Sequence, residues 1–253
     1  MDAIKSFRTG KLQTYIFENR AKMGEYAAYD IAGMLKAMLA CKPLVNVMFA
    51  SAPSQNEMLA ALALDEDVQW SRVNVFHMDE YIGLAADAPQ GFGNFLKERI
   101  GKKKPHNEYY MDPTAPDPEE EVRRYAKLLS ENPLDISILG IGENGHLAFN
   151  DPPVADFNDK QIVKVVELEE KCRLQQVHDG CFENLGQVPV RAITVTIPAL
   201  LSSGAIFCIV PAASKAEAVA NVHKGPISTA CPASILREHK AKLYLDQDSA
   251  AKL

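Results

Sequence analysis

The sequence lacks long hydrophobic runs and paired cysteines. No apolar run approaches the roughly 18 residues of a membrane span, and the N-terminal stretch "MDAIKSFRTGKLQTYIF" has no apolar core of a secretory signal. The five cysteines are odd in number and form no CxxC pair, which argues against a disulfide framework or a zinc knuckle. We therefore expect a cytoplasmic protein with reduced thiols and no membrane contact.

Positive charge is also scarce. The formal net charge is −6 and the isoelectric point is about 5.6, so a non-specific nucleic-acid partner is excluded on charge grounds. A small anionic ligand remains compatible, because a local cluster of Lys, Arg and backbone N–H groups binds phosphate even on an acidic protein. The histidines show no HxxxH or HxH spacing, and the sequence predicts neither a bound metal nor a cofactor.

Apolar runs typical of strands alternate with amphipathic stretches typical of helices. The 253 residues contain no internal repeat. Strands are expected near 44–50, 72–78, 134–142, 161–168, 191–197, 205–211 and 241–246, and helices near 19–40, 92–100, 119–132, 169–184 and 214–223. A further helix is expected to start at Ser54, which has capping-box spacing to Glu57, and the polar stretch 101–118 reads as a loop. This alternation predicts an α/β fold with a doubly wound, mostly parallel sheet and helices on both faces, Rossmann-like, as a single domain over residues 1–253.

Three polar segments follow predicted strands: "FASAPSQ", "HMDEY" and "GIGENGH". In doubly wound folds, ligands bind beyond the carboxyl ends of the strands, so these segments mark a candidate site. Asp79 and Glu80 lie just past one strand, and successive strand residues point to opposite faces. One of the two carboxylates can therefore serve a site, where it could move a proton between carbon atoms of a sugar.

The turn "GIGENGHLAFNDPP" presents His146 with Asn144 and Asp151 nearby. A histidine held by such a neighbour can act as a base near neutral pH. The spacing of the turn differs from the GxGxxG fingerprint, so we infer no dinucleotide. Lys215, at an expected helix start, suits an anion held there, and Arg173 is a second candidate cation.

Together, "HMDEY", "GIGENGHLAFND", Arg173 and "SKAEAV" resemble the glucosamine-6-phosphate deaminase/isomerase family, which is related to the 6-phosphogluconolactonases. The resemblance runs from about residue 44 to 220. It implies that His146 assists opening of the sugar ring and that Asp79 moves the C2 proton to C1, with Asn144 and Asp151 supporting His146. It also implies a set of phosphosugar-binding residues: Ser51, Ser54, Gln55, Gly140, Arg173 and Lys215.

The motifs also differ from those usual in the family. Asn144 replaces an Asp, Asp151 replaces a Glu, and "FASAPSQ" replaces a glycine- and threonine-rich phosphate loop. "PPVADFND" lacks the serine and basic residues of an allosteric site, so we expect no activation by N-acetylglucosamine 6-phosphate. The main hypothesis is conversion of glucosamine 6-phosphate to fructose 6-phosphate and ammonia. The alternatives are a 6-phosphogluconolactonase, an isomerase of another phosphosugar such as galactosamine 6-phosphate, or a non-enzymatic phosphosugar sensor. The family is often oligomeric, which makes a homo-oligomer an open expectation.

Overall fold

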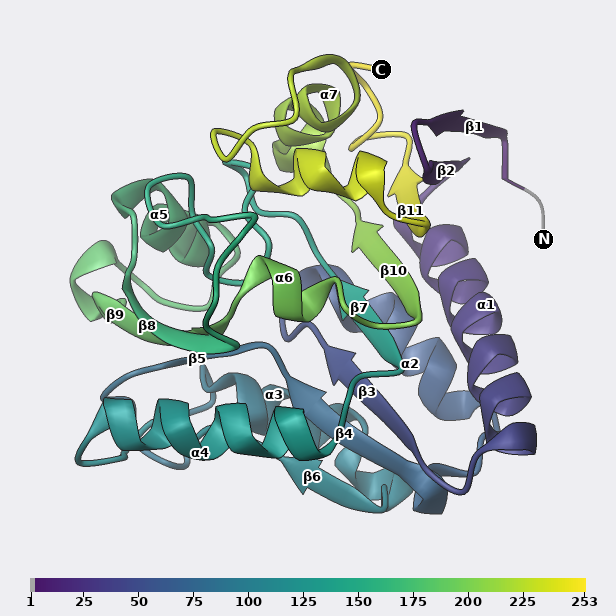
Figure 1. Cartoon of the computed structure of the whole chain (residues 1–253). Helices are drawn as coiled ribbons and strands as arrows, with labels where there is room; N and C mark the ends of the chain where they lie inside the picture. Colours follow the sequence, from purple (N-terminus) through teal and green to yellow (C-terminus); the bar gives the residue numbers. More distant parts are fainter. Residues whose placement is uncertain (1–2) are drawn as a thin grey trace.

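The computed structural model describes residues 3–253. Its central element is a sheet of eight strands, which runs through the middle of the molecule (Figure 1). The strand order is β1-β2-β11-β10-β7-β3-β4-β6. All neighbours from β2 to β6 are parallel, and only the β1–β2 pair is antiparallel. The strands are Lys5–Thr9 (β1), Leu12–Phe17 (β2), Val45–Phe49 (β3), Val73–His77 (β4), Asn107–Tyr109 (β6), Ile136–Leu139 (β7), Ala205–Val210 (β10) and Ala241–Asp246 (β11). The predicted mostly parallel sheet is confirmed.

Helices cover both faces of this sheet. They are Arg20–Cys41 (α1), Asn56–Leu64 (α2), Phe92–Arg99 (α3), Pro118–Glu131 (α4), Glu170–His178 (α5), Ile197–Leu200 (α6) and Ala216–Lys224 (α7). Side chains of β3 alternate between two apolar clusters: Val47 and Phe49 pack with α1 and α2, whereas Met48 packs with α4 and α7 on the other face. Because both faces are buried, the central strands read as continuous apolar runs, which is why the sequence identified them.

Two of the predicted strands belong to a second sheet. Val163–Glu167 (β8) and Arg191–Val195 (β9) form a three-stranded antiparallel sheet with Asp79–Tyr81 (β5), in the order β5-β9-β8. The sequence predicted both strands, but it did not predict that they form a separate sheet. The chain leaves the large sheet after β4 and, one residue later, starts β5, whose residue Asp79 pairs with Thr194. β9 pairs with this short strand on one side and with β8 on the other.

Smaller differences have local causes. β1, β2 and β6 were not predicted, and β6 lies inside the stretch 101–118 that was expected to be a loop. The helix predicted over 169–184 ends at His178, because Gly180 adopts a positive φ of 74°. Ser54 does not cap a helix: it lies in a 3₁₀ turn, Pro53–Gln55, that precedes α2. Within residues 3–253, no helix is both long and apolar enough to cross a membrane.

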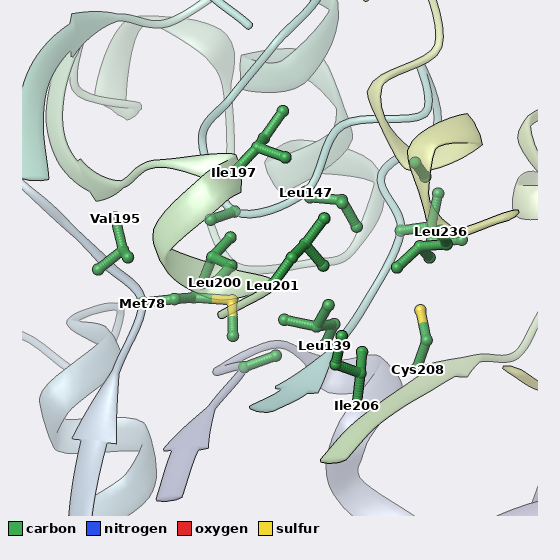
Figure 2. Close-up of a cluster of buried hydrophobic side chains, with 14 of the residues drawn as sticks. Met78, Leu139, Leu147, Val195, Ile197, Leu200, Leu201, Ile206, Cys208 and Leu236 are labelled. Atoms are coloured by element: carbon green, nitrogen blue, oxygen red, sulfur yellow. The ribbon is translucent and has the colours of Figure 1, made fainter. Parts of the chain in front are cut away.

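An apolar cluster anchors the segments that carry the polar strand ends (Figure 2). Met78, which precedes Asp79, and Leu147, which follows His146, are 2% and 0% exposed. Both belong to the same cluster as Leu139 at the end of β7 and Leu200 of α6. Full burial of such a side chain contributes about 1.5–3 kcal/mol. The packing of Met78 and Leu147 therefore fixes the backbone next to Asp79 and His146.

Candidate active site

A cavity opens where the segments that follow β3, β4, β7 and β10 meet. Residues from segments far apart in the sequence line it, and six of them were predicted: Ser51, Ser54, Asp79, Gly140, His146 and Lys215. Five further polar residues that line it were not predicted: Arg20, Gln175, Gln176, Asp179 and Ser214.

Asp79 and Glu80 serve different environments, as strand alternation predicts. Asp79 lines the cavity. Glu80 points to the other side and accepts hydrogen bonds from the backbone N–H groups of Tyr81, Phe92 and Gly93 at 3.0–3.1 Å. Burial raises the pKa of Glu80 to about 7, against the opposing effect of these donors. Glu80 thus ties β5 to the start of α3 and has a structural role.

The Asp79 carboxyl is poorly hydrated, with 7% of the residue exposed. Burial raises its pKa well above the usual value, and the nearby negative charges of Glu80 and Asp151 raise the pKa further. A carboxylate with a raised pKa is a stronger base once it is ionised. Asp79 therefore has the properties of a group that exchanges a proton with a bound ligand.

The glycine-rich turn leaves room for the His146 ring. A Cβ atom at Gly142 would lie only 2.1 Å from Cε1 of His146, so the imidazole packs directly on the glycine backbone. Gly145 has a positive φ of 85°, and a Cβ there would lie 2.7 Å from Sγ of Cys231. Gly142 is a functional position that the sequence interpretation did not single out, although the motif "GIGENGH" contains it.

His146 is paired with Asp151 at the back of the cavity. Its Nδ1 lies 2.9 Å from Oδ1 of Asp151, and the two side chains are 10% and 1% exposed. Burial by itself would raise the pKa of Asp151, but contacts with His146, the Asn144 amide and the Glu169 backbone N–H lower it below the usual value. Asp151 thus remains ionised beside the imidazole and favours a proton on Nδ1, so that Nε2 is available to a ligand.

Asn144 supports this pair indirectly. The expectation placed its side chain beside the His146 ring, but its Oδ1 accepts the backbone N–H of His146 at 3.1 Å. Its Nδ2 donates to Asp151 Oδ1 at 3.0 Å and to Glu169 Oε2 at 2.7 Å. Asn144 therefore acts on the backbone of the turn and on Asp151, and not on the imidazole itself.

Lys215 is the principal cation of the cavity. The residue is 5% exposed, and its Nζ makes no hydrogen bond or ion pair with any residue in the range 3–253. Burial lowers the pKa of Lys215, while Asp179 and Glu143 oppose this shift. Arg20 also lines the cavity, but its guanidinium is bound to both carboxylate oxygens of Glu57 at 2.7 and 2.8 Å. Lys215 is therefore available to an anion that enters the cavity, since it has no partner in the described part of the chain.

Two predicted binding residues do not line the cavity. The Nη2 atom of Arg173 donates to the carbonyl oxygens of Leu185 and Val188, both at 2.8 Å, and so holds the segment after α5. The Gln55 amide lies behind Ser54, where it donates to Ser54 Oγ and to the carbonyl of Ile209.

The face of α5 that lines the cavity is not the face that carries Arg173. Gln175, Gln176 and Asp179 share that face because residues three and four apart are neighbours on a helix. The sequence showed a helix with an arginine, but it did not show how the helix is rotated.

His146, Asp151 and Cys172 form a group whose potential ligand atoms lie within 4.8 Å of one another. Burial raises the pKa of the Cys172 thiol well above its usual value, and the nearby Asp151 carboxylate adds to the shift. Burial thus keeps Cys172 in its neutral thiol form, and not as the thiolate that ligates metals. The three side chains are better described as the buried support of His146.

The fold and this cavity agree with the known proteins that the chain resembles. The model of the family described as glucosamine-6-phosphate isomerases/6-phosphogluconolactonase matches residues 18–245. The chain belongs to this family. A glucosamine-6-phosphate deaminase of Latilactobacillus sakei is 36% identical over 188 residues, covering 74% of this chain and 78% of the relative. One of Listeria monocytogenes is 34% identical, covering 83% of this chain and 88% of the relative.

Solved structures of the family have the same fold. A monomeric glucosamine-6-phosphate deaminase superposes with a TM-score of 0.85 at 28% identity, covering 95% of this chain and 99% of the other. A 6-phosphogluconolactonase of Thermotoga maritima superposes with a TM-score of 0.75 at 20% identity, covering 93% and 99%. The second likeness concerns the fold alone.

Proposed function

We propose that the protein is a glucosamine-6-phosphate deaminase/isomerase that converts glucosamine 6-phosphate to fructose 6-phosphate and ammonia. The observation that carries this proposal is the placement of Asp79, His146 and Lys215 around one cavity. They supply a poorly hydrated carboxylate, a carboxylate-paired imidazole and a buried unpaired cation. The deaminases among the relatives support the choice of substrate.

Lys215 binds the phosphate group in this proposal. Its ammonium has no partner among the described residues, so a phosphate can satisfy it without displacing another acid. Ser51 and Ser54 stand on the same wall, and the buried Ser51 Oγ has no hydrogen-bond partner of its own. A buried hydroxyl left unsatisfied is costly, and a phosphate oxygen would satisfy it. Fixing the phosphate orients the distant C1 and C2 atoms.

His146 opens the sugar ring. Its imidazole moves a proton between the C1 hydroxyl and the ring oxygen, which breaks the bond from C1 to that oxygen and leaves an open-chain aldehyde. The Asp151 carboxylate stabilises the imidazole whenever it carries both protons. Ring opening is needed because the C2 hydrogen becomes acidic only beside a carbonyl group.

Asp79 then transfers the proton. Its carboxylate removes the C2 hydrogen while the C1 oxygen takes up a proton from water, which gives an enolamine. Asp79 then returns its proton to C1, which leaves a C1 hydroxyl and a C2 imine. Water adds to C2 and ammonia leaves, and the product is fructose 6-phosphate. The raised pKa of Asp79 favours removal of the proton, because the carboxylic acid that forms is stable in its buried site.

Product analysis tests the proposal. Purified protein is incubated with glucosamine 6-phosphate, galactosamine 6-phosphate or 6-phosphogluconolactone, and fructose 6-phosphate, ammonia and acid release are measured. The expected result is stoichiometric ammonia and fructose 6-phosphate from the glucosamine substrate. Hydrolysis of the lactone with no ammonia from either amino sugar would contradict it, as would binding of the phosphosugars without turnover.

A further inference from the structure

Glu169 contacts the support of His146 from outside the cavity. It is the residue that immediately precedes α5. Its Oε2 accepts a hydrogen bond from Asn144 Nδ2 at 2.7 Å, and its backbone N–H donates to Asp151 Oδ2 at 3.3 Å. Asn144 Nδ2 also donates to the other Asp151 oxygen, Oδ1, at 3.0 Å. Asp151, which contacts His146, is thereby held at both of its oxygens.

The position between these two acids requires an amide. Asn144 directs its NH₂ group toward two carboxylates, and its Oδ1 accepts the His146 backbone N–H. A carboxylate at this position has no hydrogen to donate, and it would stand beside two others at distances near 3 Å. Carboxylates that share a site in this way cannot all ionise, so one of them must take up a proton.

We propose that Glu169 is a positioning residue for His146 and that Asn144 and Glu169 are a matched pair. Glu169 fixes the Asn144 amide, the amide orients Asp151, and Asp151 holds the imidazole through its Nδ1. Neither Asn144 nor Glu169 lines the cavity, so the pair acts through His146 and makes no contact with a ligand there. For its catalytic consequence, this inference rests on the proposed function.

Melting temperatures test the pair without reference to activity. Asn144→Asp is expected to lower the melting temperature by roughly 5 °C, and the loss grows between pH 5 and pH 8 as the shared proton is released. Glu169→Gln alone has a small effect because an acceptor oxygen remains. The combination of Asn144→Asp with Glu169→Gln recovers at least about half of the loss, because the new glutamine amide donates to the new carboxylate.

Glu170 provides the matched control. It follows Glu169 directly and is the first residue of α5. Its side chain is exposed and makes no hydrogen bond or ion pair with any residue in the range 3–253. Glu170→Gln removes the same charge from the start of α5 but touches no member of the network. If Asn144→Asp with Glu169→Gln melts no higher than Asn144→Asp with Glu170→Gln, the matched pair is wrong.

Kinetics test the positioning role. Glu169→Ala removes the acceptor and is expected to lower kcat by about 10-fold, a part of the roughly 10²–10⁴-fold that a positioned acid–base group contributes. KM should change less than about 2-fold. A raised KM with unchanged kcat would overturn the positioning role. If the wild-type protein releases no ammonia, the proposed function fails, and the melting comparison still decides whether Asn144 and Glu169 are paired.

Discussion

At the scale of single residues, the site depends on charged groups kept out of water. Asp79 is held where its ionised form is disfavoured, and Lys215 is buried without a partner among the described residues. Neither arrangement favours the folded state. Both groups lower the stability of the folded state, and both are needed for the proposed reaction. Replacement of either group by a neutral one should therefore raise stability while activity is lost.

Asp79→Asn gives the clearest case. Because the folded-state pKa of Asp79 is raised above the usual 3.8, its contribution to stability is fully present below pH 3.8 and is lost as pH rises through the folded-state value. Asparagine does not titrate, so the variant and the wild type should melt similarly near pH 3.5. At pH 7 to 8 the variant should melt at a higher temperature, by roughly 2–4 °C for each 1 kcal/mol gained in the free energy of unfolding. Thermal melts across this pH range measure the difference, and a variant that melts lower at pH 8 would contradict the buried, proton-binding environment.

Glu80 differs from Asp79 because its carboxyl oxygens accept three backbone N–H groups, and they retain acceptor capacity in the protonated form that prevails below its pKa of about 7. Glu80→Gln replaces one acceptor oxygen by an NH₂ group that would face a backbone donor. We expect a loss of about 1–3 kcal/mol in the free energy of unfolding, measured by urea denaturation at pH 6. Glu98→Gln, an exposed substitution on α3, is the control and should change little. Equal stability of the two variants would argue against the structural role of Glu80.

At the scale of elements, the sequence predicted individual strands better than their partners. β3, β4, β7 and β10 are apolar runs that end in polar or glycine-rich loops. The ends of these runs predicted where the cavity lies, since the segments that follow them line it. The pairing of β8 and β9 could not be predicted, because a strand's own residues do not show which edge it joins. β5 has three residues, too few to read as a strand, yet it is the edge on which this sheet is built.

The helices show the same limit in another form. Arg173 was chosen because it is a cation in a motif, but the rotation of α5 gives the cavity Gln175, Gln176 and Asp179 instead. Rotation depends on what the helix packs against, which is distant in sequence. Gly142 could not be predicted for a different reason. A glycine is required there because the His146 ring packs against it, and the sequence of a glycine-rich turn does not show which glycine faces a side chain.

Gly142→Ala tests the turn. The new methyl group would overlap the His146 ring, whose Cε1 lies 2.1 Å from the Cβ position, so the imidazole must move. We expect kcat to fall by at least about 100-fold, since a displacement near 1 Å costs this much in a well-oriented site. Gly33→Ala, on α1 with open space around its Cβ position, is the matched control. Wild-type kcat in Gly142→Ala would contradict the close packing of the ring.

At the scale of the whole molecule, the protein carries a net charge of −6 and buries a lysine in its cavity. Lys215 follows β10, and Asp179 at the end of α5 stands on the same cavity wall. The two charges have opposite effects on a phosphate. A protein of this overall charge gains nothing from long-range attraction of an anionic substrate, so local groups must supply the binding.

This balance predicts opposite changes in KM. Lys215→Met should raise KM for glucosamine 6-phosphate by at least about 10-fold, which corresponds to loss of about 1.4 kcal/mol of binding. Asp179→Asn should lower KM several-fold, because it removes a negative charge and keeps an oxygen that can accept the hydrogen bond from Gln175 Nε2. Initial-rate kinetics at low salt give both values. A rise in KM for Asp179→Asn would show that the carboxylate binds the sugar.

The measurement that tests the central claim most directly is proton NMR of glucosamine 6-phosphate in D₂O, with the wild-type protein and with Asp79→Asn. Ammonia is assayed in the same tubes, and binding of the phosphosugar to the variant is checked by calorimetry. The account predicts that the wild type replaces the C2 proton and releases ammonia. It predicts that Asp79→Asn binds the sugar and does neither. Normal proton exchange in the variant, or none in the wild type, would contradict the assignment of Asp79 as the base.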